Sequence, residues 1–231
     1  MHRIDILVSG KGSLLPPIVE AVKQGEIPAY IGQVISDRPG AAALEYARKA
    51  GLKTLCLDRK EYGRYGRQAE QSEPGGEVCG SGKQSETAGP ATLSDAILER
   101  VRGEADLLVL AGFLSILEGP LLDEFKWRIL NIHPALLPAH GGRGMYGMKV
   151  HEAVIREGDS RSGCTVHFVT EGVDRGPVVL QRTVPVGPSE SAGTLSQKVH
   201  SIEGETLVEA IGMVLEGCEA MKRTDIGGEQ R

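Results

Sequence analysis

Short apolar runs alternate with helix-spaced segments along the first quarter of the chain. Runs rich in Val, Ile and Leu favour strands, and hydrophobic residues three or four apart favour amphipathic helices. We expect strands at residues 4–8, 31–36 and 53–57, with helices at residues 14–24 and 41–50 between them. This order predicts a parallel sheet with right-handed crossover connections.

The same pattern resumes in the second half of the chain. We expect strands at residues 105–111, 128–131, 164–169 and 177–186, and helices at residues 94–102 and 149–156 and from Ser191 or Thr194 to about residue 216. The last two strands read as a hairpin joined by a polar loop. The fold class is therefore α/β, a Rossmann-like doubly wound, mostly parallel sheet with a C-terminal antiparallel hairpin portion.

One stretch shows neither the strand pattern nor the helix pattern. Residues from about Gly66 to Pro90 are polar and rich in Gly, Ser, Glu and Gln, a composition that buries little apolar surface. We expect a mobile insertion there, within a single domain of residues 1–220 that is followed by a polar tail at 221–231. The sequence leaves open whether the insertion is inert, ordered by a ligand or a partner site.

Composition narrows the function classes. The net charge of −5 and the aromatic share of 4% argue against nucleic-acid binding, which needs a basic surface or stacking platforms. Cys56 and Cys164 fall in predicted strands and are expected to be small core residues. No signal peptide is evident and no apolar run is long enough to span a membrane, so we expect a cytoplasmic protein.

The stretch Asn131 to Pro138, Asn-Ile-His-Pro-Ala-Leu-Leu-Pro, is the first chemical candidate. Its prolines stop regular structure just after a predicted buried strand. Asn131 and His133 are two residues apart and therefore point the same way at the strand end, where open α/β sheets keep their sites. The alternative is a capped strand whose histidine is satisfied by the backbone.

A second candidate follows the first strand. Ser9-Gly10-Lys11-Gly12-Ser13 leads into a helix with two prolines in its first turn, and Ser13 is the expected N-cap. A strand, a glycine turn and a helix start present backbone N–H groups to an anion, which suggests a phosphate site. The alternative is an ordinary tight turn.

Other polar residues have simpler interpretations. Without further context Asp174 could be a turn residue, and His167 is better explained as a structural histidine than as a second base. His133, His140 and His151 with Asp174 match no metal-ligand spacing. The glycine-rich segment Gly141 to Gly147 is expected to be a loop that can close over a ligand.

Four blocks in order carry a resemblance to a known family. They are Ser9-Gly10-Lys11-Gly12-Ser13, Leu110-Ala111-Gly112-Phe113, Asn131-Ile132-His133-Pro134 with Leu136-Leu137-Pro138, and Thr165-Val166-His167-Phe168-Val169 with Asp174-Arg175-Gly176-Pro177. The chain resembles the glycinamide ribonucleotide (phosphoribosylglycinamide) formyltransferases, folate-dependent enzymes of purine biosynthesis. The resemblance runs from Ile4 to about Gly217, apart from the predicted insertion.

The resemblance implies site residues at matching positions. The catalytic set would be Asn131, His133 and Asp174. Nucleotide-substrate contacts would come from Gly12, Ser13, Leu14, Gly112, His200 and Glu203, with Leu14 in place of the usual Asn and His200 in place of a Gln. Folate contacts would come from Arg64, Leu114, Ser115, Ile116, Leu117, Asn131, Thr170, Glu171, Gly172, Val173 and Asp174.

The resemblance also implies the chemistry. The cosubstrate would be 10-formyltetrahydrofolate and the acceptor glycinamide ribonucleotide, with no metal, no nucleic acid and no membrane, in a monomer or homodimer. Asn131 would donate to the oxyanion, His133 would carry the proton, and Asp174 would favour its imidazolium form.

Three alternatives remain open at the level of sequence. A formyltetrahydrofolate deformylase shares the central motif but usually has a preceding regulatory domain. A methionyl-tRNA formyltransferase usually carries an additional basic domain. A non-catalytic nucleotide-binding module would not need Asn131, His133 and Asp174 together.

Overall fold

The computed structural model describes residues 1–62 and 90–226, with side chains up to residue 217. These residues form a seven-stranded sheet in the order β3-β2-β1-β4-β5-β6-β7. The strands are β1 (His2–Val8), β2 (Ala29–Ser36), β3 (Thr54–Cys56), β4 (Leu107–Leu110), β5 (Ile129–His133), β6 (Arg161–Phe168) and β7 (Val178–Pro185). The first five strands are parallel, and β5-β6 and β6-β7 are antiparallel. The predicted fold class is confirmed.

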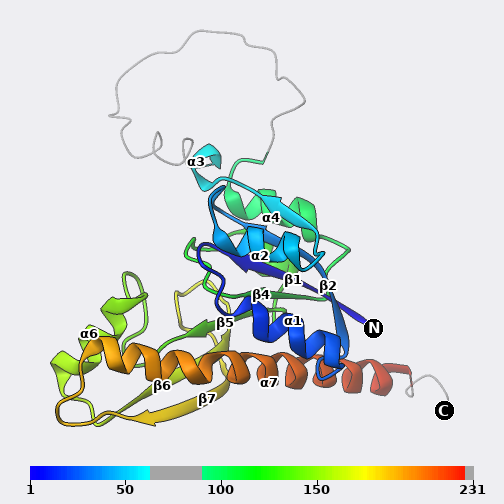
Figure 1. The fold of residues 1–231 in the computed structure, drawn as a ribbon. Coiled ribbons are helices and arrows are strands. Elements are labelled where there is room, and N and C mark those ends of the chain that lie inside the picture. The colour runs from blue at the N-terminus through cyan, green and yellow to red at the C-terminus, as the bar shows by residue number, and fades with distance from the viewer. Residues whose placement is uncertain (63–89, 227–231) are drawn as a thin grey trace, which may run out of the picture.

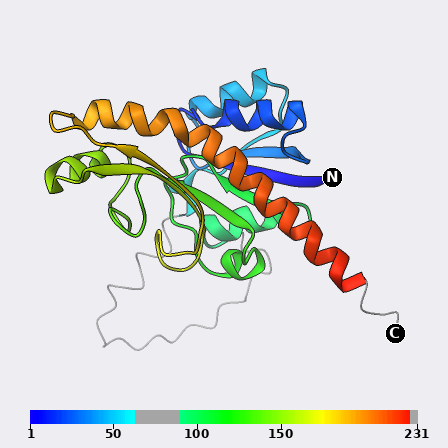
Figure 2. The ribbon, with the colours of Figure 1, turned by 90° about the horizontal axis from the view of Figure 1, so that it is seen from below.

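Helices cover both faces of this sheet. They are α1 (Leu15–Gln24), α2 (Ala42–Lys49), α3 (Arg59–Tyr62), α4 (Leu93–Val101), α5 (Pro120–Glu124), α6 (Met148–Glu157) and α7 (Ala192–Ile226). Figure 1 shows α7 running the length of the molecule beside α1. Figure 2 shows α1, α2 and α7 on one face of the sheet, with α4 on the other.

The alternation of side chains along β1 explains the two hydrophobic layers. Ile4, Ile6 and Val8 are fully buried in the cluster that joins the sheet to α1, α2 and α7. Leu7 is fully buried in the cluster on the opposite face, which joins the sheet to α4 and α5. A strand with both faces covered buries nearly every side chain, which is why this stretch is mostly apolar. The exception is Asp5, which is fully buried and accepts hydrogen bonds from Arg3 and Gln33.

The predicted cap of one helix and the predicted start of another are wrong. Helix α1 begins at Leu15 with Leu14 as its N-cap and no capping side chain, so Ser13 does not cap it. Helix α4 is capped by Thr92, which forms a capping box with Asp95, because only Thr92 has Asp95 three residues later. Ser94 instead accepts a hydrogen bond from the backbone N–H of Glu118.

Some boundaries also differ from expectation. Helix α7 continues to Ile226, ten residues beyond the expected end near residue 216. The helices α3 and α5 were not expected, because four and five residues are too short to show a helical period. Cys164 is buried as expected, whereas Cys56 is exposed at the edge strand β3, so its predicted core role is wrong. Most of the predicted insertion, with Arg64, lies outside the described residues.

The change from parallel to antiparallel pairing places polar residues together. Strand β5 ends at His133, and β6 returns beside it with Asn131 opposite His167 and His133 opposite Thr165. Residues directly opposite in an antiparallel pair lie on the same face of the sheet. Asn131, His133, Thr165 and His167 therefore project to one side at the carboxyl end of β5.

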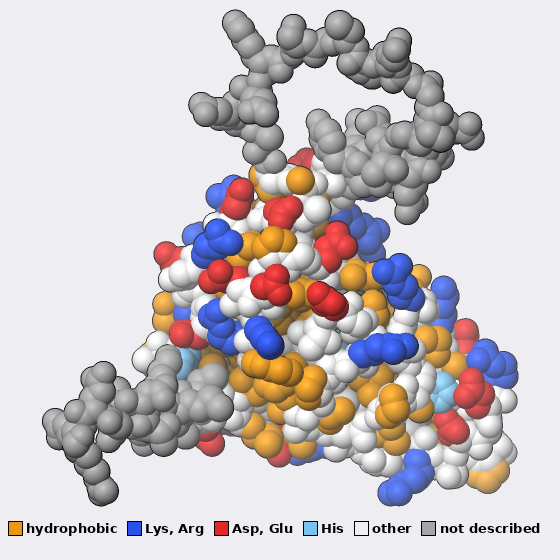
Figure 3. All heavy atoms as spheres, turned by 180° about the vertical axis from the view of Figure 1, so that it is seen from behind, with side chains coloured by type: hydrophobic (Ala, Val, Ile, Leu, Met, Phe, Trp, Pro, Cys, Tyr) orange, Lys and Arg blue, Asp and Glu red, His pale blue; other side chains and the backbone are white. Residues whose placement is uncertain are grey.

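The surface mixes charges of both signs. On the face seen in Figure 3, Lys and Arg side chains are scattered among Asp, Glu and hydrophobic side chains. Among the helices of the described ranges, none combines the length and hydrophobicity needed to cross a bilayer.

Candidate active site

A pocket of about 490 Å³ opens at the carboxyl ends of β4 and β5. This volume is typical of a site for a small-molecule ligand. Its walls come from the end of β5 and from segments 112–117, 142–147 and 169–174, and it also reaches the start of α1 and Glu203 of α7. Ligands of open α/β sheets bind at this edge because the loops that leave the strands converge there.

Asn131 is held by a histidine on the neighbouring strand. Its amide nitrogen Nδ2 lies 3.1 Å from Nε2 of His167. Nδ1 of His167 lies 2.9 Å from the Phe168 carbonyl oxygen, which can only accept a hydrogen bond. His167 therefore donates from Nδ1 and accepts at Nε2, and one amide hydrogen of Asn131 remains for a ligand.

His133 faces the carboxylate of Asp174 across the pocket wall. Nδ1 of His133 lies 3.5 Å from Oδ2 of Asp174, within the range of a direct ion pair. Oδ2 also accepts a hydrogen bond from the Gly142 N–H at 2.9 Å, and Oδ1 lies 3.6 Å from Nε2 of His167. Asp174 has a φ of 56°, a left-handed conformation that Asp adopts more readily than most residues. Its carboxylate thus joins the two histidines and the 142–147 loop.

Burial decides the charge state of His133. It lowers the pKa of the imidazole, and the attraction of Asp174 and the hydrogen bond to His140 oppose this shift without cancelling it. Burial alone would raise the pKa of Asp174, but the hydrogen bond from the Gly142 N–H and the positive charge that His133 carries once protonated hold it below its usual value. Asp174 therefore favours the imidazolium form of His133, as expected. Because burial outweighs this effect, His133 is a neutral base at neutral pH, beside an ionised Asp174 carboxylate.

A buried threonine fixes the turn that follows His133. Its hydroxyl, Thr165 Oγ1, donates to the Ala135 carbonyl at 2.6 Å and accepts from the Leu137 N–H at 3.1 Å. The Gln181 amide nitrogen completes the cluster, at 2.7 Å from Thr165 Oγ1 and 3.2 Å from the Leu137 carbonyl. The 134–137 segment is therefore tied to both β6 and β7, and it cannot shift without breaking several buried hydrogen bonds.

The 113–117 wall of the pocket is tied to two other strands. The hydroxyl of Ser9, just after β1, accepts a hydrogen bond from the Leu114 N–H at 2.8 Å. Ser115 donates to the buried carboxylate of Asp37, just after β2, at 2.6 Å. Leu114 and Ile116 remain about half exposed and line the pocket, so this wall offers apolar surface to a ligand.

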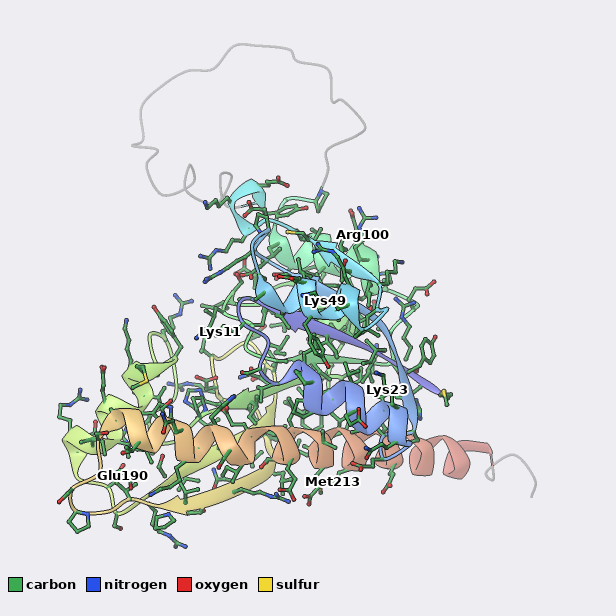
Figure 4. The ribbon with its side chains drawn as sticks, viewed as in Figure 1. Lys11, Lys23, Lys49, Arg100, Glu190 and Met213 are labelled. Atoms are coloured by element: carbon green, nitrogen blue, oxygen red, sulfur yellow. The ribbon has the colours of Figure 1, made fainter. Side chains whose placement is uncertain are left out.

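The start of α1 borders the other end of the pocket. Gly12 has a φ of +70°, and a Cβ there would lie 2.4 Å from the Cβ of Ala43, so only glycine fits against α2. Ser13 and Leu14 line the pocket, and Leu14 provides no side-chain cap for the helix. Backbone N–H groups at a helix start attract anions. Figure 4 shows Lys11 in the loop after β1, at the same edge of the sheet.

Glu203 lines the pocket from α7, and His200 does not. His200 is half exposed, and its Nδ1 lies 2.7 Å from Oε2 of Glu203. His200 is therefore linked to the pocket through its contact with Glu203.

Most of the expected site residues line this one pocket. They are Ser13, Leu14, Gly112, Leu114, Ser115, Ile116, Leu117, Asn131, His133, Thr170, Glu171, Gly172, Val173, Asp174 and Glu203. Gly12 does not line the pocket and packs against Ala43 of α2. His200 contacts Glu203 outside the pocket lining, and Arg64 lies outside the described residues. The segment 142–147 lines the pocket, as expected of a loop near a ligand.

His167 is the residue whose place the sequence analysis missed. Both of its nitrogens have partners, as expected of a structural histidine, but one partner is Asn131 and the nearest carboxylate is Asp174. The antiparallel pairing of β5 with β6 brings it into the site. The alternation of Thr165 and His167 shows that they share one face of their strand. Only the register of β5 and β6 shows that this face is the one with Asn131 and His133.

Comparison with known proteins agrees with this architecture. Residues 2–211 match the family model described as formyl transferase. The phosphoribosylglycinamide formyltransferase of Haemophilus influenzae is 33% identical, over 96% of this chain and 91% of the relative. A solved glycinamide ribonucleotide transformylase of Symbiobacterium toebii is 35% identical with a TM-score of 0.77, covering 94% of this chain and 89% of that one.

Longer relatives contain the same unit. The trifunctional purine biosynthetic protein adenosine-3 of Bos taurus is 34% identical over 94% of this chain. The chain spans only 18% of the length of that relative.

Proposed function

Because this chain belongs to the formyl transferase family, we propose that it transfers the formyl group of 10-formyltetrahydrofolate to the amine of glycinamide ribonucleotide. The observation that carries the proposal is the meeting of Asn131, His133 and Asp174 in a pocket that also reaches the start of α1. The reaction belongs to purine biosynthesis, and we propose that it takes place in the cytoplasm.

The two ends of the pocket suit the two substrates. The helix start at Ser13 and Leu14 would hold the phosphate of the nucleotide, and Glu203 would accept hydrogen bonds from ribose hydroxyls. The half-exposed apolar side chains of Leu114 and Ile116, with the 170–174 loop, would hold the pterin ring. Binding both partners in one pocket places the amine next to the formyl carbon and removes the entropic cost of their meeting during the reaction.

The catalytic residues would act in sequence. The amine nitrogen attacks the formyl carbon, and the amide hydrogen of Asn131 that does not bond to His167 donates to the developing oxyanion. The neutral imidazole of His133 accepts the proton released by the amine. The resulting imidazolium is stabilised by Asp174, 3.5 Å away. Cleavage of the bond from the formyl carbon to N10 then returns that proton to N10.

A direct assay tests the proposal. The purified protein, 10-formyltetrahydrofolate and glycinamide ribonucleotide should yield formylglycinamide ribonucleotide and tetrahydrofolate. The Asn131→Ala and His133→Ala variants should each lose about two to four decades in kcat. Glu152→Gln, an exposed change on α6 away from the pocket, is the control and should keep the wild-type rate.

Three results would contradict the proposal. Near-normal turnover in both alanine variants would remove the mechanism. Release of formate from 10-formyltetrahydrofolate without any amine, at a rate equal to or above the transfer rate, would assign the protein to the deformylases instead. Absence of both reactions would favour a non-catalytic binding module.

A further inference from the structure

His133 makes a second contact, outside the proposed catalytic set. Its Nε2 lies 2.8 Å from the backbone carbonyl oxygen of His140. A carbonyl oxygen can only accept, so Nε2 must carry a hydrogen in this arrangement. The nitrogen free to gain or lose a proton is then Nδ1, which faces Asp174.

The carbonyl of His140 is held in place by its own side chain. His140 has a φ of 53°, an uncommon left-handed backbone for a residue of this size. Its imidazole is 6% exposed, and its Nε2 lies 2.6 Å from Oδ2 of Asp159, in the loop between α6 and β6. Nδ1 of the same ring lies 3.8 Å from Oε2 of Glu157, at the end of α6. The two carboxylates thus hold the ring whose backbone turns toward His133.

We call His140 and the two carboxylates that hold its ring, Asp159 and Glu157, the His140 clamp. The His140 clamp lies outside the lining of the main pocket. His140 and Asp159 border a separate cavity of about 260 Å³, together with Ser160, Arg161 and Ser162. Neither His140 nor Asp159 lines the main pocket. The contact of Asp159 with His140 is therefore its route to His133.

We propose that His140 and Asp159 are positioning residues that fix His133 as the Nε2–H tautomer, so that Nδ1 is the atom that carries the proton. The proposal rests on the proposed function only for its consequence on rate, because the tautomer is a property of the protein alone. Hydrogen bonds at one ring nitrogen generally decide which tautomer a functional histidine adopts.

The groups around His133 determine the pKa that an NMR titration of its ring would measure. Four titratable groups face His133: Asp174 from the β6–β7 loop, His167 from β6, Glu203 from α7 and His151 from α6. Asp174, Glu203 and the His140 carbonyl raise the pKa of His133, whereas burial and His167 lower it. Loss of the His140 hydrogen bond should therefore lower the pKa further.

The first test needs no substrate. In the protein labelled with 15N-histidine, a long-range 1H–15N correlation spectrum near pH 8 should show His133 protonated at Nε2 and unprotonated at Nδ1. The His133→Gln variant assigns the signals by their disappearance. A His133 signal with the Nδ1–H pattern would overturn the proposal, whether or not the protein transfers formyl groups.

The second test removes the Asp159 carboxylate from the His140 clamp. Asp159→Ala should lower the titration midpoint of His133 and reduce kcat by roughly tenfold, with KM for both substrates nearly unchanged. Asp159→Asn keeps an oxygen acceptor for His140 and should restore most of the rate. The matched control is Glu152→Gln, also on the surface near α6. An unchanged His133 spectrum and kcat in a folded Asp159→Ala variant would overturn the proposal, whereas an inactive wild-type protein would refute only the proposed function.

Discussion

The amide of Asn131 and the ring of His167 face each other across the β5–β6 pair, with Nδ2 and Nε2 3.1 Å apart. His167 uses its other nitrogen on the Phe168 carbonyl, and so it can offer Asn131 only an acceptor. This leaves the Asn131 amide with a single orientation, in which its Nδ2 points toward His167 and its remaining hydrogen is available for an oxyanion.

His167→Asn should therefore impair catalysis through Asn131. We expect kcat to fall by about 10- to 100-fold, the usual effect of losing a residue that orients a catalytic group, with little change in folate affinity. A double-mutant cycle with Asn131→Ala checks the route. If His167 acts through Asn131, the double variant should be no slower than Asn131→Ala alone. Fully additive losses would mean that His167 acts independently.

Asp174→Asn removes the charge that faces His133 and keeps the backbone. Asn tolerates the left-handed conformation at this position, and its oxygen can still accept from the Gly142 N–H. Because Asp174 raises the pKa of His133, the variant should titrate His133 at a lower pH. We expect kcat to fall by about two decades, since the imidazolium loses its partner, while folate still binds. An NMR titration of His133 measures its pKa, steady-state kinetics measure kcat, and equilibrium binding measures the affinity for folate.

Stability should fall as pH decreases from 7 to 5. Burial lowers the folded-state pKa of His133 and His151 below the unfolded value, so the unfolded chain binds the extra protons first. Each such histidine destabilises the fold by about 1.4 kcal/mol per pH unit, between its unfolded and folded pKa. The pKa of Asp174 is shifted down as well, so its contribution is lost at still lower pH, as the carboxylate becomes protonated.

Urea unfolding at pH 7 and pH 5 measures this effect. The His151→Gln variant should lose less stability over that interval than the wild type, because one of the two protonation events is removed. Equal free energies of unfolding at both pH values in the wild-type protein would contradict the prediction.

The sequence predicted the central strands of the sheet well because they are buried on both faces. A continuous apolar run such as Leu107 to Leu110 can hardly be anything but a central strand, and β4 confirms this. Asn131 and His133 could be paired from the two-residue period alone. His167 could not be placed, because its position depends on the register between β5 and β6, a tertiary property.

Helix ends were less predictable, because contacts between segments distant in sequence help to set them. Ser13 and Ser94 both have good capping side chains, yet the helices begin elsewhere. The start of α1 is set by the close approach of Gly12 to Ala43 on α2, a contact between segments distant in sequence. Likewise, the contact of His140 with Asp159 joins two loops and leaves no periodic trace in the sequence.

Two buried threonines provide a matched test of the turn after His133. Thr165 and Thr206 are both fully buried, and valine has nearly the same shape at either position. Thr165→Val would leave the Ala135 carbonyl, the Leu137 N–H and the Gln181 amide without their shared partner. We expect a loss of about 1–3 kcal/mol in the free energy of unfolding, because buried polar groups lose their hydrogen bonds.

Thr206→Val should be milder. Its hydroxyl donates at 2.7 Å to the Ile202 carbonyl of its own helix, a group that helical hydrogen bonding already satisfies. The decisive difference is in the reaction. Because the Thr165 cluster fixes the segment that follows His133, Thr165→Val should also lower kcat, whereas Thr206→Val should leave kcat unchanged. Equal kcat values in the two variants, at measurably different stabilities, would mean that the order of the 134–137 segment does not limit the reaction.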